Sequence, residues 1–158
     1  GWDHWTVGGF LALWVIGYGG VQSIAPLLLG RGNIPDGKTV TLWALLLCSI
    51  PALIALALTA NWHIELALLG GLLLFGIVFA INSSVHSYLI VSYAKSDGVS
   101  MDVGFYYMAN AMGRLLGTVL SGWLYQTAGL ATCLWVSTAM LVMTVIVSGM
   151  LPTIKSAQ

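Results

Sequence analysis

Long apolar runs separated by short polar connections make up most of the chain. About 20 continuously apolar residues are enough to cross a bilayer as a helix. Five runs reach that length, over residues 6–29, 39–60, 65–94, 103–126 and 131–151. The strands of a membrane barrel would alternate apolar and polar residues, and these runs do not. We therefore predict an all-α fold, a polytopic bundle of about five transmembrane helices.

The connections between the runs have the composition of turns. Residues 30–38 are rich in Gly, Pro, Asn and Asp, residues 95–102 are similar, and residues 61–63 and 127–129 form shorter corners. No connection is long enough to hold a soluble domain, so residues 1–158 form one transmembrane region. Because the first run begins almost at Gly1, we expect an N-terminal part of the protein to be absent.

Basic and aromatic residues predict the orientation. Four of the five Lys and Arg residues fall on one side of the expected bilayer: Arg31, Lys38, Lys95 and Lys155. The positive-inside rule makes that side, and with it the C-terminus, cytoplasmic in a multi-pass protein of a bacterial inner membrane. Tryptophans gather near the expected membrane boundaries, as in an aromatic belt: Trp2, Trp5, Trp62, Trp123 and Trp135 on the outer side, and Trp43 on the inner side.

The composition excludes several classes of function. The chain is 59% hydrophobic and 6% charged, whereas a soluble domain is about one quarter charged. Its net charge of zero gives no basic surface for nucleic acid. Cys48 and Cys133 lie inside apolar runs without metal or redox spacing, so we expect no metal site and no cofactor. No P-loop and no nucleophile with a partnering base is visible, and we expect no enzyme.

Arg114 carries the most information about function. It lies about 11 residues, or ~16 Å, into the run 103–126 and therefore near the middle of the bilayer. A charge at that depth costs at least ~2.5–3.5 kcal/mol on insertion scales. No acidic residue of the chain reaches the same depth. We expect Arg114 either to bind an anionic solute or to pair with an acid in the absent part of the protein.

Polar residues of three runs fall into two layers when the helical rise is counted, one near the midplane and one about 6–9 Å toward the cytoplasm. The first layer holds Tyr18, Asn82 and Arg114, and the second holds Gln22, His86 and Asn110. Tyr107 shares a helix face with Asn110 and Arg114. Such layers are typical of a central substrate site, which we predict to consist of Arg114, Asn110, Asn82, His86, Tyr107, Gln22 and Tyr18.

Each of these residues also has a purely structural interpretation. Asn82, Ser83 and Gln22 are equally suited to hydrogen bonds between helices, worth ~0.6 kcal/mol each. His86 is either a proton carrier or a neutral ring bonded between helices. Tyr107 belongs to a residue type that often fills gaps between helices. The residues alone leave these alternatives open.

Residues 104–126, GFYYMANAMGRLLGTVLSGWLYQ, resemble the eleventh span of a major facilitator superfamily permease. The polar patch of residues 82–88 strengthens the likeness, and together the two segments are most similar to organoarsenical efflux permeases of the ArsJ type. The likeness covers the whole chain, as spans eight to twelve of twelve. It implies a partial C-terminal half of the superfamily fold, with a missing N-terminal half that completes a central cavity of alternating access.

The resemblance also implies a substrate and a companion enzyme. Permeases of the ArsJ type are associated with the efflux of 1-arseno-3-phosphoglycerate, which glyceraldehyde-3-phosphate dehydrogenase makes from arsenate, and so with arsenate resistance. A guanidinium such as that of Arg114 suits an oxyanion of this kind. Two alternatives remain: a permease of the same superfamily for another organic anion or a drug, and a non-transporting scaffold subunit whose polar residues bind partner helices.

Overall fold

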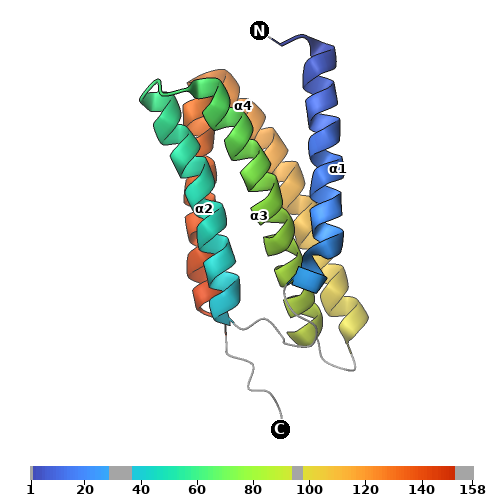
Figure 1. The fold of residues 1–158 in the computed structure, drawn as a ribbon. Coiled ribbons are helices and arrows are strands. Elements are labelled where there is room, and N and C mark those ends of the chain that lie inside the picture. The colour runs from blue at the N-terminus through green and yellow to red at the C-terminus, as the bar shows by residue number, and fades with distance from the viewer. Residues whose placement is uncertain (1, 29–36, 94–97, 152–158) are drawn as a thin grey trace.

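The structure is a computed structural model that describes residues 2–28, 37–93 and 98–151 (Figure 1). These residues form helices and no strand: α1 His4–Leu28, α2 Gly37–Thr59, α3 Ile64–Tyr93 and α4 Val99–Gly149. The all-α prediction is confirmed, and each helix is long and apolar enough to cross a membrane. The first three predicted runs match α1, α2 and α3 to within a few residues, whereas the last two both fall in α4.

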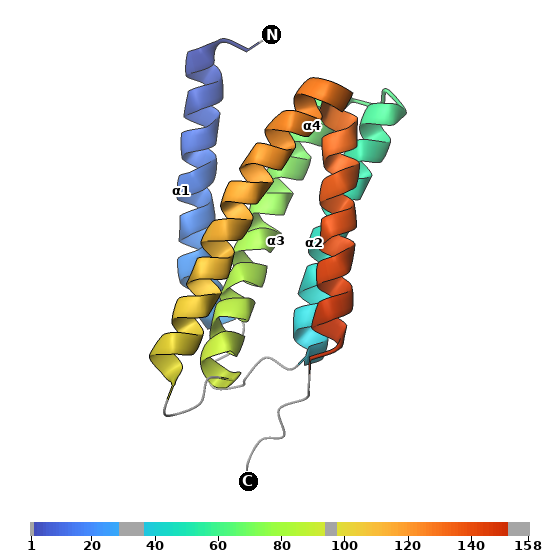
Figure 2. The same ribbon diagram turned by 180° about the vertical axis from the view of Figure 1, so that it is seen from behind.

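The long helix α4 consists of two limbs that meet at Gly129. The backbone there is not helical, with φ 81° and ψ 177°, a region that residues with a side chain rarely enter. The first limb covers residues 99–128 and the second covers residues 130–149. Figure 2 shows the second limb running back beside α2, while the first limb crosses α3 on the side that faces the viewer. The turn falls at the corner predicted for residues 127–129.

A second tight corner joins α2 to α3. Asn61 and His63 have positive φ values of 51° and 39°, and Asn accepts such a conformation better than most residues. The backbone N–H of Trp62 donates to the carbonyl oxygen of Ala57 at 3.0 Å, which closes the turn. Three of the basic residues behind the predicted orientation lie outside the described residues: Arg31, Lys95 and Lys155.

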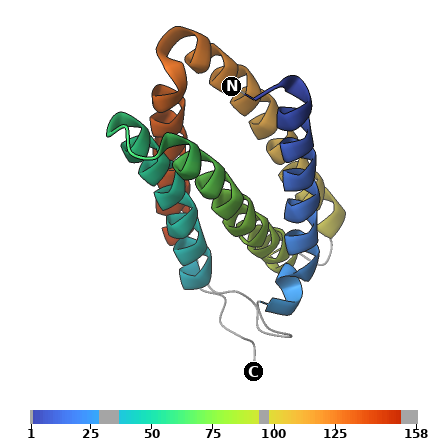
Figure 3. The same ribbon diagram turned by 45° about the horizontal axis from the view of Figure 1, so that its top comes forward.

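The apolar core forms where α3 meets its neighbours. Figure 3 shows α1 on one side of α3, and α2 with the second limb of α4 on the other. The buried residues Leu47, Ile50 and Ile54 of α2 pack with Val78 of α3. The second limb closes over α2, where the thiol of Cys48 donates to the carbonyl oxygen of Thr138 at 3.7 Å. The first limb contributes little to this core, since residues 111–120 are all exposed.

The start of α1 is capped by Asp3, whose carboxylate accepts the backbone N–H of Thr6 at 2.8 Å. The hydroxyl of Thr6, and then this N–H, lower the pKa of Asp3 below its ordinary value of 3.8. The cap is therefore present at pH values well above 3.8 and is lost as the pH falls through the lowered pKa. We expect the midpoint of the pH-dependent shift of the Thr6 amide resonance, followed by NMR in detergent micelles, to lie below pH 3.8.

Replacing Asp3 by Asn provides the matched control for this cap. The carboxamide oxygen still accepts the N–H of Thr6 but does not titrate, so the same resonance should stay constant as the pH falls. A Thr6 resonance that shifts equally in both proteins would show that another group controls this end of α1.

Candidate functional site

A polar groove opens where α1, α3 and the first limb of α4 come together. It encloses about 670 Å³. Its walls come from three helices, α1 with Gly19, Gln22, Ser23 and Pro26, α3 with Ser84, Ser87 and Tyr88, and α4 with Tyr107. Two of the seven predicted site residues, Gln22 and Tyr107, therefore lie on one surface.

Hydrogen bonds fix the three helices around this groove. The hydroxyl of Ser84 donates to the backbone oxygen of Gln22 at 3.3 Å and joins α3 to α1. The hydroxyls of Ser87 and Tyr106 lie 3.2 Å apart and join α3 to α4. Within the described part of the chain no residue bonds the side-chain amide of Gln22 or the hydroxyl of Tyr107. Both polar groups are thus available to a solute in the groove.

The polar face of α4 continues this wall along the first limb. Asn110 and Arg114 follow Tyr107 by three and seven residues, so all three share one face, and Arg114 lies ~10 Å farther along the helix. The hydroxyls of Thr118 and Ser121 donate to the backbone oxygens of Arg114 and Thr118, at 2.8 and 3.1 Å. These two hydroxyls are used within the helix, which leaves the side chains of Tyr107, Asn110 and Arg114 as the donors of this face.

Arg114 is exposed and has no carboxylate partner among the described residues. The acidic residues in that part of the chain stand at or beside helix starts: Asp3 caps α1, Glu65 is in the first turn of α3, and Asp102 is in the first turn of α4. No charged side chain lines the polar groove itself. Arg114 is thus the one positive charge in the middle of any described helix.

His86 lies on another side of α3 and lines a second cavity of about 390 Å³. The neighbours there include Tyr106 of the first limb and Thr144 and Ser148 of the second limb. The Nδ1 atom of His86 is 2.9 Å from the backbone oxygen of Asn82. A carbonyl oxygen only accepts, so in this hydrogen bond Nδ1 is the donor.

The remaining two predicted residues are placed away from the groove. Asn82 is buried, with 7% of its surface exposed, and its side-chain oxygen has no hydrogen-bond partner among the described residues. Tyr18 stacks between Trp14 and Phe79, with ring centroids 5.9 and 5.7 Å away, and lines an apolar groove between α1 and α3. The structure therefore distributes the predicted layer over several surfaces rather than gathering it in one cavity.

The predicted site omitted four polar residues of the groove: Ser23, Ser84, Ser87 and Tyr88. A usable signal existed for the three on α3, because they lie in the polar patch of residues 82–88 and recur at the spacing of one helix face. Ser23 offered no such signal, since its hydroxyl donates to the backbone oxygen of Gly19 at 2.8 Å, as in many apolar helices.

The groove offers amide and hydroxyl groups, with one guanidinium farther along its wall, which suits the binding of a polar or anionic solute. Among the described residues no group of three or more His, Cys, Asp and Glu side chains is placed to hold a metal ion. Comparisons of the chain with protein-family models, with curated proteins and with solved structures find no match.

Proposed function

We propose that the protein is part of a permease of the major facilitator type that exports a small organic anion. Arg114 is the observation that carries the proposal. Its guanidinium is exposed, unpaired by any described carboxylate, and on the same helix face as a residue that lines the polar groove. Ionisable residues within membrane helices commonly mark a solute pathway, because their desolvation is otherwise uncompensated.

The exposed first limb of α4 supports an arrangement in which the rest of the permease faces that limb. Residues 111–120 have no cover from the described helices, yet they carry a charge that lipid would not solvate. A second half of the permease facing this limb would turn the polar face into the wall of an enclosed cavity. In this arrangement α1, α2, α3 and the two limbs of α4 make five spans, with the C-terminus in the cytoplasm of a bacterial inner membrane.

The substrate that best fits the proposal carries a phosphate or arsenate group. A planar guanidinium binds such oxyanions with two parallel hydrogen bonds. The amide of Asn110 on the same helix face, and that of Gln22 in the groove, offer further donors. The likeness of residues 104–126 to permeases of the ArsJ type points to 1-arseno-3-phosphoglycerate, supplied by a glyceraldehyde-3-phosphate dehydrogenase that acts on arsenate. His86, in its separate cavity, would act on coupling or packing rather than on the anion.

An efflux assay tests this function. The intact permease is produced in an arsenate-sensitive bacterium, with and without the dehydrogenase, and cellular arsenic is measured after exposure to arsenate. We expect cellular arsenic to fall only when both proteins are present, because the permease exports 1-arseno-3-phosphoglycerate and not arsenate itself. Unchanged arsenic, with both proteins present and the permease in the membrane, would exclude this substrate, and competition with other organic anions and drugs would then identify the solute.

A further inference from the structure

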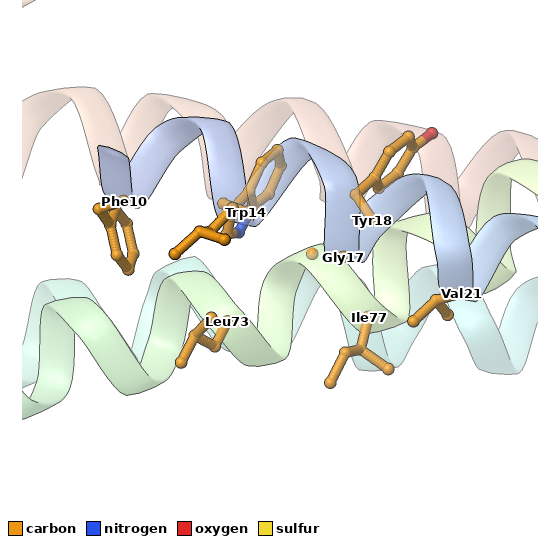
Figure 4. A pocket seen from close by; sticks show the side chains of 9 residues that line it. Phe10, Trp14, Gly17, Tyr18, Val21, Leu73 and Ile77 are labelled. Carbon is orange, nitrogen blue, oxygen red and sulfur yellow. The ribbon is translucent and has the colours of Figure 1, made fainter. Parts of the chain in front are cut away.

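An apolar groove runs between α1 and α3, apart from the polar groove (Figure 4). It encloses about 460 Å³. On α1 its lining recurs once per helix turn, with Phe10, Trp14 and Tyr18 in one row and Gly17 and Val21 in the next. On α3 it is bounded by Ile77 and its neighbours. No residue between Trp5 and Leu28 of α1 carries a charge, so the groove lies within the apolar part of that helix.

The polar atoms of the groove walls are either bonded within the protein or turned away from the groove. The indole N–H of Trp14 donates to the backbone oxygen of Leu72 at 2.8 Å. The ring fits against α3 because position 76 is glycine, where a Cβ atom would stand 2.9 Å from the indole. The hydroxyl of Tyr18 points away from Leu73 (Figure 4). The lining is therefore almost entirely carbon, and an occupant must itself be apolar.

The dimensions of the groove decide between a lipid chain and a helix. From Phe10 to Val21 it extends ~16 Å along α1, which matches the ~15 Å that one lipid chain covers in a bilayer with ~30 Å of hydrocarbon. A helix about 10 Å across would need roughly 1,250 Å³ over that length. The groove offers about 460 Å³, too little for a helix to sit inside it.

We propose that this groove holds one acyl chain of a bilayer phospholipid, aligned with α1. The inference rests on the membrane-type helices and the shape of the groove, and it does not depend on the proposed transport function. Gly17 forms part of the lining, and a Cβ atom added there would have no neighbour within 4 Å, so that space is open to the acyl chain.

Filling the groove with a side chain tests the inference. Gly17→Leu places a branched side chain in the open space, and Gly20→Leu adds the same group three residues away, outside the groove and equally unobstructed. Each protein is purified in detergent, incubated with dioleoylphosphatidylcholine and washed, and its mass is then measured by native mass spectrometry. We expect the parent and Gly20→Leu to retain one more lipid per chain than Gly17→Leu. Equal retention in all three would overturn the proposal.

A second measurement keeps the test decisive if Gly17→Leu does not fold. Phosphatidylcholine brominated on its chains quenches nearby indoles, and the contribution of Trp14 is the difference between the parent and Trp14→Phe. We expect that contribution to remain quenched after the wash that removes loosely bound lipid. Loss of quenching on washing would overturn the proposal. So would a parent that dimerises through this face, with Gly17→Leu monomeric, because a second copy would then be the occupant.

Discussion

Under the proposed function, replacing Arg114 by Ala in the intact protein is expected to abolish arsenate resistance, with its amount in the membrane unchanged. Removing one partner of a desolvated, hydrogen-bonded charge pair costs about 2–5 kcal/mol, or roughly a 30- to 5,000-fold loss of affinity. Arg114 is exposed in the described structure and supports no core contact there, so the loss should fall on the solute rather than on folding. Growth in arsenate and cellular arsenic, measured at matched protein levels, check this result.

Two further variants separate a solute site from other roles of the same charge. Thr118→Val alters the neighbouring turn on the same face, but its hydroxyl serves only the backbone oxygen of Arg114, so resistance should be retained. Arg114→Lys keeps the positive charge but cannot form the bidentate hydrogen bonds of a guanidinium, so its arsenate resistance should lie between those of the parent and Arg114→Ala. Full resistance in Arg114→Ala would contradict the anion site. Loss of assembly, rescued by exchanging Arg114 with an acid of a partner helix, would instead support the scaffold alternative.

The helices could be predicted from the sequence because their signal is local. A continuously apolar run in lipid must form a helix, whatever it packs against, because only its own backbone can satisfy its N–H and C=O groups there. The corners were equally visible, since Asn61 and Gly129 adopt backbone conformations that suit Asn and Gly. Only the ends differ by a few residues, as at the start of α4, where the helix begins at Val99 and the apolar run at residue 103.

The candidate site could be predicted only in part. Counting residues along a helix gives the depth of a side chain in the membrane, but it does not give the direction in which that side chain points. Counting placed Gln22 and His86 at one level, but the structure directs them to two different cavities. Which face of α3 meets α1 and which meets α4 depends on contacts such as those of Ser84 with Gln22 and Ser87 with Tyr106. Such contacts join residues far apart in the sequence, and no local pattern encodes them.

Gly129→Ala is expected to destabilise the turn between the two limbs of α4. With φ 81° and ψ 177°, this residue occupies a region reserved for glycine, and a side chain there costs about 1–3 kcal/mol. Open space surrounds the position, so the cost comes from the backbone and not from a clash. At about 2–4 °C per kcal/mol for a chain of this size, the melting temperature in detergent should fall by roughly 2–12 °C.

Gly122→Ala is the matched control for this prediction, because it makes the same change in the same helix with equally open surroundings. Gly122 has helical backbone geometry, and alanine favours a helix over glycine by about 1 kcal/mol. Its melting temperature should therefore stay constant or rise, opposite in sign to that of Gly129→Ala. If both variants melt like the parent, the turn at Gly129 does not limit the stability of the bundle, and the second limb is held by its packing on α2 alone.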